Sequence, residues 1–128
     1  MVHATLAQDP YRVDIVAGDH AVIGDESKEH GGGDAGPSPF DLVLSGLAAC
    51  TLITLRMYAE RKGWSGFECT SRLRHRQEGA AHFIDREVEA RGVPDAASLE
   101  RLRDIVERTP VTLALKGGFS IATVLSGD

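Results

Sequence analysis

The chain has 128 residues, of which 42% are hydrophobic and 26% charged, so we expect one domain over residues 1–128 and exclude two large domains. The net charge is −5 and the 14 Lys and Arg residues are scattered, which argues against nucleic acid as a partner because phosphate binding needs clustered cations. The first eight residues lack the basic and apolar segments of a secretory signal, so the sequence predicts a cytoplasmic protein.

A β-hairpin is predicted at the start of the chain. Residues 11–15 alternate between apolar and polar side chains, Gly18 and Asp19 can form a tight turn, and residues 21–23 resume an apolar run. Residues 25–36 then combine charged side chains with four glycines, a composition that predicts a flexible surface loop.

A long helix is predicted from Ser38 to about Lys62. Ser38 can cap its first turn, Pro39 suits the first helical position, and the carboxylate of Asp41 faces the positive end of the helix dipole. Gly63 can adopt the left-handed conformation that commonly ends a helix. The sequence therefore defines both ends of this helix.

The first half of the predicted helix, residues 42–55, is apolar on every side. It is shorter than the roughly 20 residues of a membrane span, so we predict a core helix and no membrane. A helix that is apolar all round must be surrounded by protein, which a domain of this size can hardly supply alone. Small residues would let the same helix of a second subunit approach, and a helix wrapped by its own sheet is the alternative; the small residues are Ser45, Gly46, Ala48 and Ala49.

A second hairpin is predicted from residues 67–74 and 82–90, with a turn at residues 77–80. Apolar and polar side chains alternate along its first strand, which places Cys69 on the face toward the core. Packing is therefore the expected role of Cys69. His75 and His82 flank the turn, and surface positions are expected for them rather than metal binding.

The remaining elements are a helix and a strand. Asp95 or Ser98 can open the helix, Pro110 limits its continuation, and residues 119–125 are predicted to form a final strand. One face of the helix is predicted to carry Leu99, Leu102, Val106 and Thr109. Hairpins grouped between helices favour an α+β fold with antiparallel strands.

Four segments carry a family resemblance: residues 36–42 (GPSPFDL), 48–51 (AACT), 54–59 (TLRMYA) and 61–64 (RKGW). Together they resemble the central part of the osmotically inducible protein C (OsmC) and organic hydroperoxide resistance (Ohr) superfamily. The resemblance implies antiparallel sheets around a long buried central helix. It also implies an intertwined homodimer with a site between the subunits.

The resemblance further implies cysteine chemistry. In characterised members a helix-borne cysteine attacks a peroxide, a second cysteine resolves the sulfenic acid, and an Arg and a Glu activate the first thiol. The attacking position corresponds to Cys50. The resolving position holds Thr109, the carboxylate position holds Phe40 with Asp41 one residue later, and His20 stands where the arginine is expected.

Activation of Cys50 is expected to come from elsewhere in the dimer. The nucleophilic form of cysteine is the thiolate, which a nearby cation or a helix N-terminus stabilises, and Cys50 lies about three turns into its own helix. His20 and Arg56 are the candidate activating residues, and Phe40 and Leu47 are expected to line the pocket.

The leading functional hypothesis is a weak, thiol-dependent reductase of organic hydroperoxides that uses Cys50 in a one-cysteine cycle. The expected partners are a second copy of the chain, a small hydrophobic or peroxide substrate and an external thiol as reductant. No metal and no cofactor are expected. The alternative is a noncatalytic dimer that binds a small hydrophobic ligand between its subunits.

Overall fold

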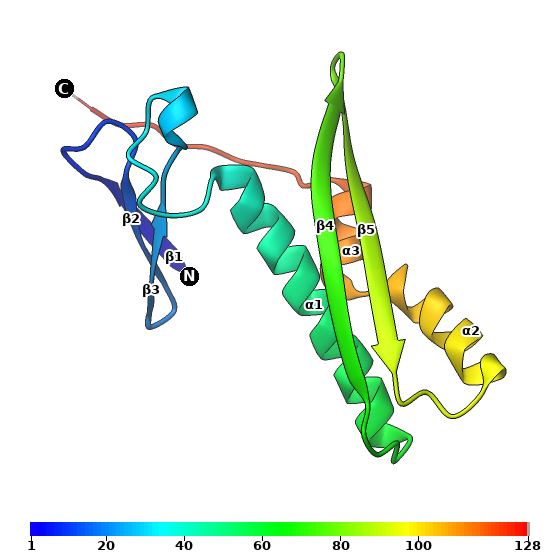
Figure 1. The fold of residues 1–128 in the computed structure, drawn as a ribbon. Coiled ribbons are helices and arrows are strands. Elements are labelled where there is room, and N and C mark those ends of the chain that lie inside the picture. The colour runs from blue at the N-terminus through cyan, green and yellow to red at the C-terminus, as the bar shows by residue number, and fades with distance from the viewer. Residues whose placement is uncertain (128) are drawn as a thin grey trace. The chain divides into compact units, whose positions relative to one another are not determined.

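The computed structural model describes residues 1–127, which form an α+β fold with antiparallel sheets, as the sequence predicted (Figure 1). Along the chain its elements are β1 (Val2–Leu6), β2 (Val13–Ala17), β3 (His20–Gly24), a 3-10 turn (Lys28–His30), α1 (Pro39–Arg61), β4 (Glu68–Glu78), β5 (Ala81–Arg91), α2 (Ala96–Val106) and α3 (Pro110–Gly117).

Backbone contacts divide this chain into two units. The first comprises Met1–Gly46 and Arg74–Ile84, and the second comprises Leu47–Leu73 and the chain from Asp85 onward. The helix α1 and the strands β4 and β5 each contribute residues to both units.

The first unit contains a three-stranded sheet in the order β1-β2-β3. The predicted hairpin is confirmed as β2 and β3, which turn at Gly18, where φ is +61°. Strand β1 was not predicted from the sequence. It pairs with β2 over its whole length, from Val2 opposite Ala17 to Leu6 opposite Val13.

The loop of residues 25–36, predicted to be flexible, is organised around one buried carboxylate. Asp25 is only 3% exposed, and its side chain accepts hydrogen bonds from the N–H groups of Glu26 (2.7 Å) and Ala35 (3.0 Å). The hydrogen bond from Ala35, more than any other interaction, lowers the pKa of Asp25 below its ordinary value. The ionised side chain of Asp25 thus joins the two ends of the loop.

Replacing Asp25 with alanine is expected to destabilise the chain at pH 7. Because folding lowers the pKa of Asp25, its contribution is present above the unfolded value of about 3.9 and is lost as the pH falls through the folded value. Urea unfolding should therefore separate the two proteins at pH 7 and separate them less at pH 3. The exposed Asp9→Ala variant is the control, and a difference that grows on acidification would contradict the prediction.

The ends of α1 match the sequence prediction. The Ser38 hydroxyl accepts a hydrogen bond from the Asp41 N–H (3.3 Å), Pro39 is the first helical residue, and Gly63 has a φ of +70° beyond Arg61. By length and hydropathy alone α1 could cross a membrane, a test that the core helix of a soluble protein also passes.

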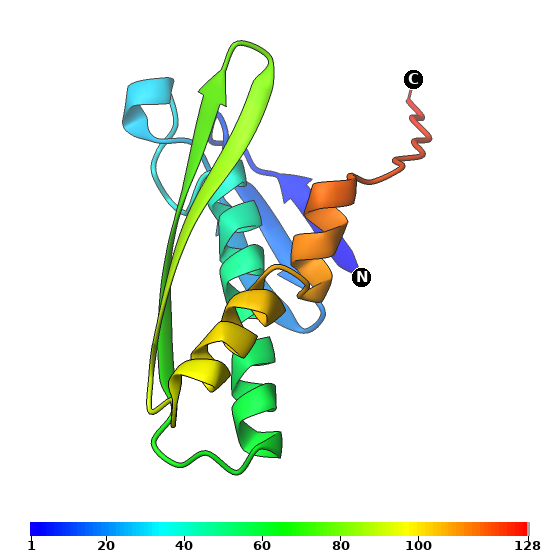
Figure 2. The same cartoon turned by 90° about the vertical axis from the view of Figure 1, so that its right-hand side faces the viewer.

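The second unit packs two helices on a hairpin. Figures 1 and 2 show α2 and the C-terminal part of α1 lying against one face of β4 and β5. The core between them consists of Leu55, Ala59 and Leu102 from the helices and of Phe67, the residue just before β4. Asp95 caps α2 by accepting a hydrogen bond from the Ser98 N–H (2.7 Å). The predicted inward position of Cys69 is confirmed, since this side chain packs against the same cluster.

Two predictions for the C-terminal part of the chain are wrong. Thr109 is not on α2: it is the N-cap of α3, which Pro110 begins instead of merely ending the preceding helix. Residues 119–125 form no strand, since none of their backbone groups pairs with another strand among residues 1–127. Four apolar side chains of this segment are largely exposed: Phe119, Ile121, Val124 and Leu125.

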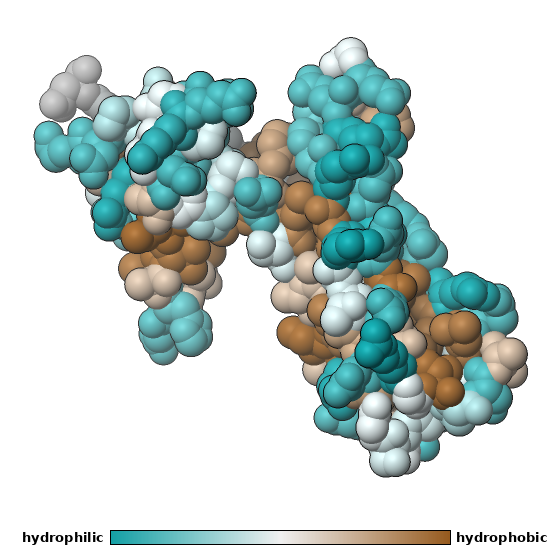
Figure 3. All heavy atoms as spheres, in the orientation of Figure 1, coloured by the Kyte–Doolittle hydropathy of each residue, from teal (hydrophilic) through white to brown (hydrophobic). Residues whose placement is uncertain are grey.

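Much of the apolar surface of α1 is uncovered in the single chain. Val43, Ile53 and Met57 are 43%, 54% and 57% exposed, and Figure 3 shows apolar side chains at the surface over this helix. With Gly46 and Cys50 between them, these residues follow a spacing of three and four that is typical of helix pairing. We call these five residues the α1 stripe.

Candidate functional site

Cys50 lies in the middle of α1, half-buried, with its sulfur at the start of another helix. The backbone N–H of Val111 donates to Cys50 Sγ at a distance of 3.5 Å. Val111 is the second residue of α3, after Pro110 and the N-cap Thr109. A segment 61 residues later in the sequence therefore reaches the cysteine.

Cys50 lies in the middle of α1, far from the N–H groups at the start of that helix, but the start of α3 lies beside its sulfur. The first N–H groups of a helix lack partners within it and carry the positive end of its dipole, so an acceptor placed there is stabilised, above all when it is negatively charged. The group that contacts Cys50 Sγ is therefore neither His20 nor Arg56 but a backbone N–H of the same chain, on a helix that the sequence interpretation missed.

A buried guanidinium holds the neighbourhood of α3 together. Arg86 on β5 donates from Nη1 to the hydroxyls of Thr51 (3.0 Å) and Thr112 (2.9 Å), and from Nη2 to the carbonyl of Val106 (2.8 Å). Its side chain is 12% exposed. One residue therefore connects β5 with α1, with the end of α2 and with the first turn of α3.

Hydroxyl groups complete this network beside Cys50. The Thr51 hydroxyl, on the residue after Cys50, also donates to the carbonyl of Leu47 (2.8 Å). The hydroxyls of Thr109 and Thr112 lie 2.7 Å apart, and both side chains are buried. The residue at the family's resolving position thus makes a polar contact within α3 and carries no sulfur.

An ion pair at the edge of the network joins α2 to α3. Lys116 Nζ lies 2.6 Å from the carboxylate of Glu107, and Arg86 lies 3.9 Å from the same carboxylate. The hydrogen bond from Lys116 is the largest cause that lowers the pKa of Glu107. Glu107 therefore supplies a negative charge close to the otherwise buried Arg86.

Cys69 differs from Cys50 in its surroundings. Its Sγ lies 3.9 Å from the carbonyl of Leu52, and burial raises the pKa of its thiol, an effect that the positive charge of Arg56 partly offsets. A raised pKa leaves less thiolate at neutral pH, so the environment of Cys69 favours packing over reaction.

The other candidate residues are divided between the two units. In the first unit, His20 is exposed at the start of β3, and Phe40 stacks on His75 with ring centroids 3.9 Å apart. Asp41 is exposed in the first turn of α1. In the second unit, Leu47 is buried, and the guanidinium of Arg56 lies 5.7 Å from the ring centre of Phe67.

The arrangement of the histidine and acidic side chains bears on metal binding. His75 and His82 are hydrogen-bonded to each other at 2.8 Å. Within residues 1–127, no group of three or more His, Cys, Asp or Glu side chains is arranged to hold a metal ion.

The sequence interpretation missed Arg86 and Val111, although each has a local signal. Arg86 shares the inward-facing positions of β5 with Val88 and Ala90, and a charged residue in such a series indicates a buried, hydrogen-bonded cation. For Val111 the signal is the preceding pair Thr109 and Pro110, since a hydroxyl residue followed by proline is typical of a helix start.

The protein-family comparison agrees with this architecture. The family model for the OsmC-like protein matches residues 31–124, a segment that includes Cys50, Arg86 and Val111. The chain belongs to the OsmC family. A search of curated proteins gave no match.

Solved structures show the same OsmC-like fold. An OsmC-like protein from Mycoplasma pneumoniae is 20% identical, with a TM-score of 0.72, over 91% of this chain and 86% of the other. A protein from Psychrobacter arcticus 273-4, named for a proposed role in osmotic stress and detoxification, is 17% identical, with a TM-score of 0.75, over 88% and 85%.

A third structure carries a name that refers to redox chemistry. It is the organic hydroperoxide resistance protein OsmC of Legionella pneumophila, described as a predicted redox protein and regulator of sulfide bond formation. It is 20% identical to this chain, with a TM-score of 0.64, and the alignment covers 91% of this chain and 88% of the other. At such identities the likeness concerns the fold.

Proposed function

We propose that this OsmC-family protein is a thiol-dependent reductase of organic hydroperoxides, with Cys50 as the attacking residue. The observation that carries the proposal is the 3.5 Å contact between Cys50 Sγ and the Val111 N–H at the start of α3. The contact holds the sulfur beside one of the first N–H groups of α3, which find no acceptor within that helix. The redox role named for the Legionella relative supports the same reading.

The cycle requires one protein thiol and an external one. The Cys50 thiolate attacks the distal oxygen of the hydroperoxide, the O–O bond breaks, and the alkoxide leaves as an alcohol after taking a proton, while Cys50 becomes a sulfenic acid. An external thiol then forms a mixed disulfide with Cys50 and releases water. A second external thiol restores the Cys50 thiol and leaves as the oxidised disulfide. Thr109 supplies no sulfur and Cys69 packs in the core, so the proposed reductant is an external thiol.

The functional unit we propose is a cytoplasmic homodimer of a single-domain chain. The α1 stripe leaves an apolar face uncovered in one chain, and a second copy with the same stripe would cover it. Cys50 belongs to that stripe, so pairing would place the sulfur close to the subunit interface. An apolar surrounding of this kind would favour organic over strongly hydrated peroxides.

Replacing Cys50 with serine is expected to abolish reduction of cumene hydroperoxide supported by an external dithiol. The wild-type activity is expected to be weak, because Phe40 and Thr109 replace the family's carboxylate and second cysteine. Peroxide consumption and alcohol formation measure turnover. Mass spectrometry after one equivalent of peroxide should find a sulfenic acid, or a mixed disulfide with added thiol, on Cys50.

Cys69→Ser is the matched control, because it also removes one thiol and is expected to keep most of the activity. Turnover that survives in Cys50→Ser would remove Cys50 from the chemistry. A rapid, stoichiometric Cys50–Cys69 disulfide would contradict both the packing role of Cys69 and the one-cysteine cycle.

A noncatalytic ligand-binding dimer is the second candidate. Phe40 in place of a carboxylate and Thr109 in place of a cysteine favour it, because both changes remove groups that the family's chemistry uses. A wild-type protein that consumes no hydroperoxide yet binds an apolar probe only as a dimer would support this candidate over the first.

A further inference from the structure

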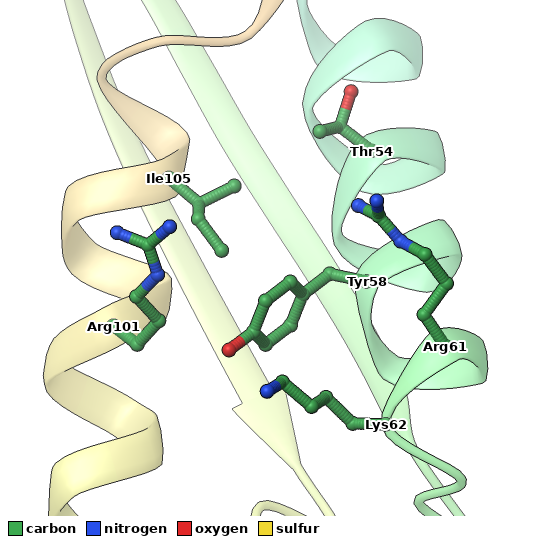
Figure 4. A pocket seen from close by; sticks show the side chains of 6 residues that line it. All are labelled: Thr54, Tyr58, Arg61, Lys62, Arg101 and Ile105. Carbon is green, nitrogen blue, oxygen red and sulfur yellow. The ribbon is translucent and has the colours of Figure 1, made fainter.

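A cleft between α1 and α2 in the second unit is lined by cationic side chains. Its volume is about 400 Å³, which falls in the range of small-molecule sites. Figure 4 shows the side chains that line it: Thr54, Tyr58, Arg61 and Lys62 from α1 and its end, and Arg101 and Ile105 from α2. None of these lining residues is acidic, so the cleft carries a positive charge.

The three cations of the cleft are poorly neutralised. Within residues 1–127, neither Arg61 nor Lys62 forms an ion pair with a carboxylate. Arg101 contacts Asp104 from Nη1 at 2.8 Å, and Asp104 is shared with Arg108. Five guanidinium N–H groups are available on each arginine, so most of the donors of Arg61 and Arg101 remain free for a ligand.

The positions of Arg61 and Lys62 have a simpler explanation than ligand binding, but that explanation does not cover Arg101. Cations at the end of a helix stabilise its negative dipole end, and both residues are at the end of α1. Arg101, however, lies in the middle of α2 and lines the same cleft. Dipole stabilisation of α1 does not account for a third cation that lines the same cleft from a second helix.

The floor of the cleft is apolar. Figure 4 shows the Tyr58 ring projecting from α1 toward α2, with Ile105 facing it. Lys62 Nζ lies 5.6 Å from the centre of the Tyr58 ring, and the Trp64 ring meets the Tyr58 ring edge-on at 5.6 Å. A ligand with an apolar body could lie on Tyr58 and Ile105 while its charged group meets the cations.

We propose that this cleft binds a phosphate monoester of a small organic molecule. A phosphate group carries about −1.5 to −2 charge at pH 7 and three acceptor oxygens, which suits three cations arriving from two helices. A carboxylate carries a single charge that one arginine can neutralise in a bidentate contact. The cleft does not contain Cys50, so the proposal goes beyond the peroxide chemistry and does not depend on it.

Trp64, the only tryptophan of the chain, is a built-in reporter because it contacts Tyr58. Phenyl phosphate should change its fluorescence in a saturable manner, and calorimetry should give the same dissociation constant. Inorganic phosphate is expected to bind more weakly because it lacks the apolar body. Benzoate is expected to bind more weakly because of its single charge, and added salt should weaken all three.

Arg61→Gln and Arg101→Gln are each expected to raise the dissociation constant of phenyl phosphate about tenfold, since each removes charge-assisted hydrogen bonds. Arg103→Gln is the matched control, because Arg103 is also on α2 but pairs with Glu100 and does not line the cleft. It should bind like the wild type. Cys50→Ser should also bind like the wild type, which separates this test from that of the peroxidase.

Three results would overturn the proposal. The first is no binding of phenyl phosphate by the wild type at millimolar concentrations, and the second is equal affinity in Arg61→Gln, Arg101→Gln and the wild type. The third is self-association that weakens in Arg61→Gln while phenyl phosphate has no effect, which would assign the cations to a carboxylate of a second copy.

Discussion

Replacing Arg86 with methionine is expected to lower the free energy of unfolding by about 2–4 kcal/mol. Methionine keeps an apolar stem but removes three hydrogen bonds, to the hydroxyls of Thr51 and Thr112 and to the carbonyl of Val106. The Val106 carbonyl would lose its strongest donor inside the protein. Removal of one partner from a buried charged network costs more than the loss of an exposed ion pair, because the remaining groups stay desolvated.

Urea unfolding at pH 7 measures the effect of Arg86→Met. Arg72→Met is the matched control. Arg72 also belongs to the hairpin of β4 and β5 and pairs with Glu87 at 2.7 Å, but its side chain is 86% exposed. Exposed pairs of this kind contribute about 0–1 kcal/mol. Equal destabilisation by the two variants would show that the Arg86 network is not a special source of stability.

Glutamate at both Ile53 and Met57 is expected to convert the proposed dimer into monomers. The two side chains belong to the α1 stripe, and a second copy packed on the stripe would bury the new charges without partners. The dissociation constant should rise roughly a thousandfold or more. Light scattering at micromolar concentration should give twice 13.7 kDa for the wild type and 13.7 kDa for the variant.

Leu99→Glu is the control for this experiment, since Leu99 is a partly exposed apolar residue on α2 and lies outside the stripe. It should leave the dimer intact. A wild-type chain that is monomeric at micromolar concentration would contradict the prediction outright. Dimerisation of the double glutamate variant would move the interface away from α1.

Local sequence signals correctly predicted the helix ends and the hairpin turn that are determined by neighbouring residues. Ser38 and Gly63 bound α1, Asp95 caps α2, and Gly18 turns the first hairpin, each through contacts or dihedral angles within a few residues. Capping and turn preferences act at this range, so the sequence contains the necessary information.

Elements that depend on distant partners were harder to predict. Residues 119–125 have the composition of a strand, but a strand needs a neighbour, and the single chain provides none for them within residues 1–127. Pro110 illustrates a different ambiguity, because proline ends one helix and begins the next equally well. The interpretation that used only the first property missed α3.

The residues of the candidate site also fall into those that a local motif identifies and those that only a distant contact identifies. Cys50 could be singled out from its motif on one helix. Val111 and Arg86 could not be assigned to it, because they approach α1 from sequence separations of 61 residues for the contact to Cys50 and 35 residues for the contact to Thr51. Only the folding of β5 and α3 against α1 brings these groups together, and no local pattern specifies that arrangement.

The exposed segment of residues 119–125 (FSIATVL) has the composition of a fibril-forming peptide: it is rich in apolar and β-branched residues and lacks charge, glycine and proline. Such a segment with unpaired backbone groups can add to an identical segment of another molecule. Thioflavin fluorescence should therefore rise sooner for the Ile53→Glu, Met57→Glu monomer than for the wild type if dimerisation covers this segment, and equal rates would show that it does not. Subunit pairing would then also protect the chain against amyloid formation.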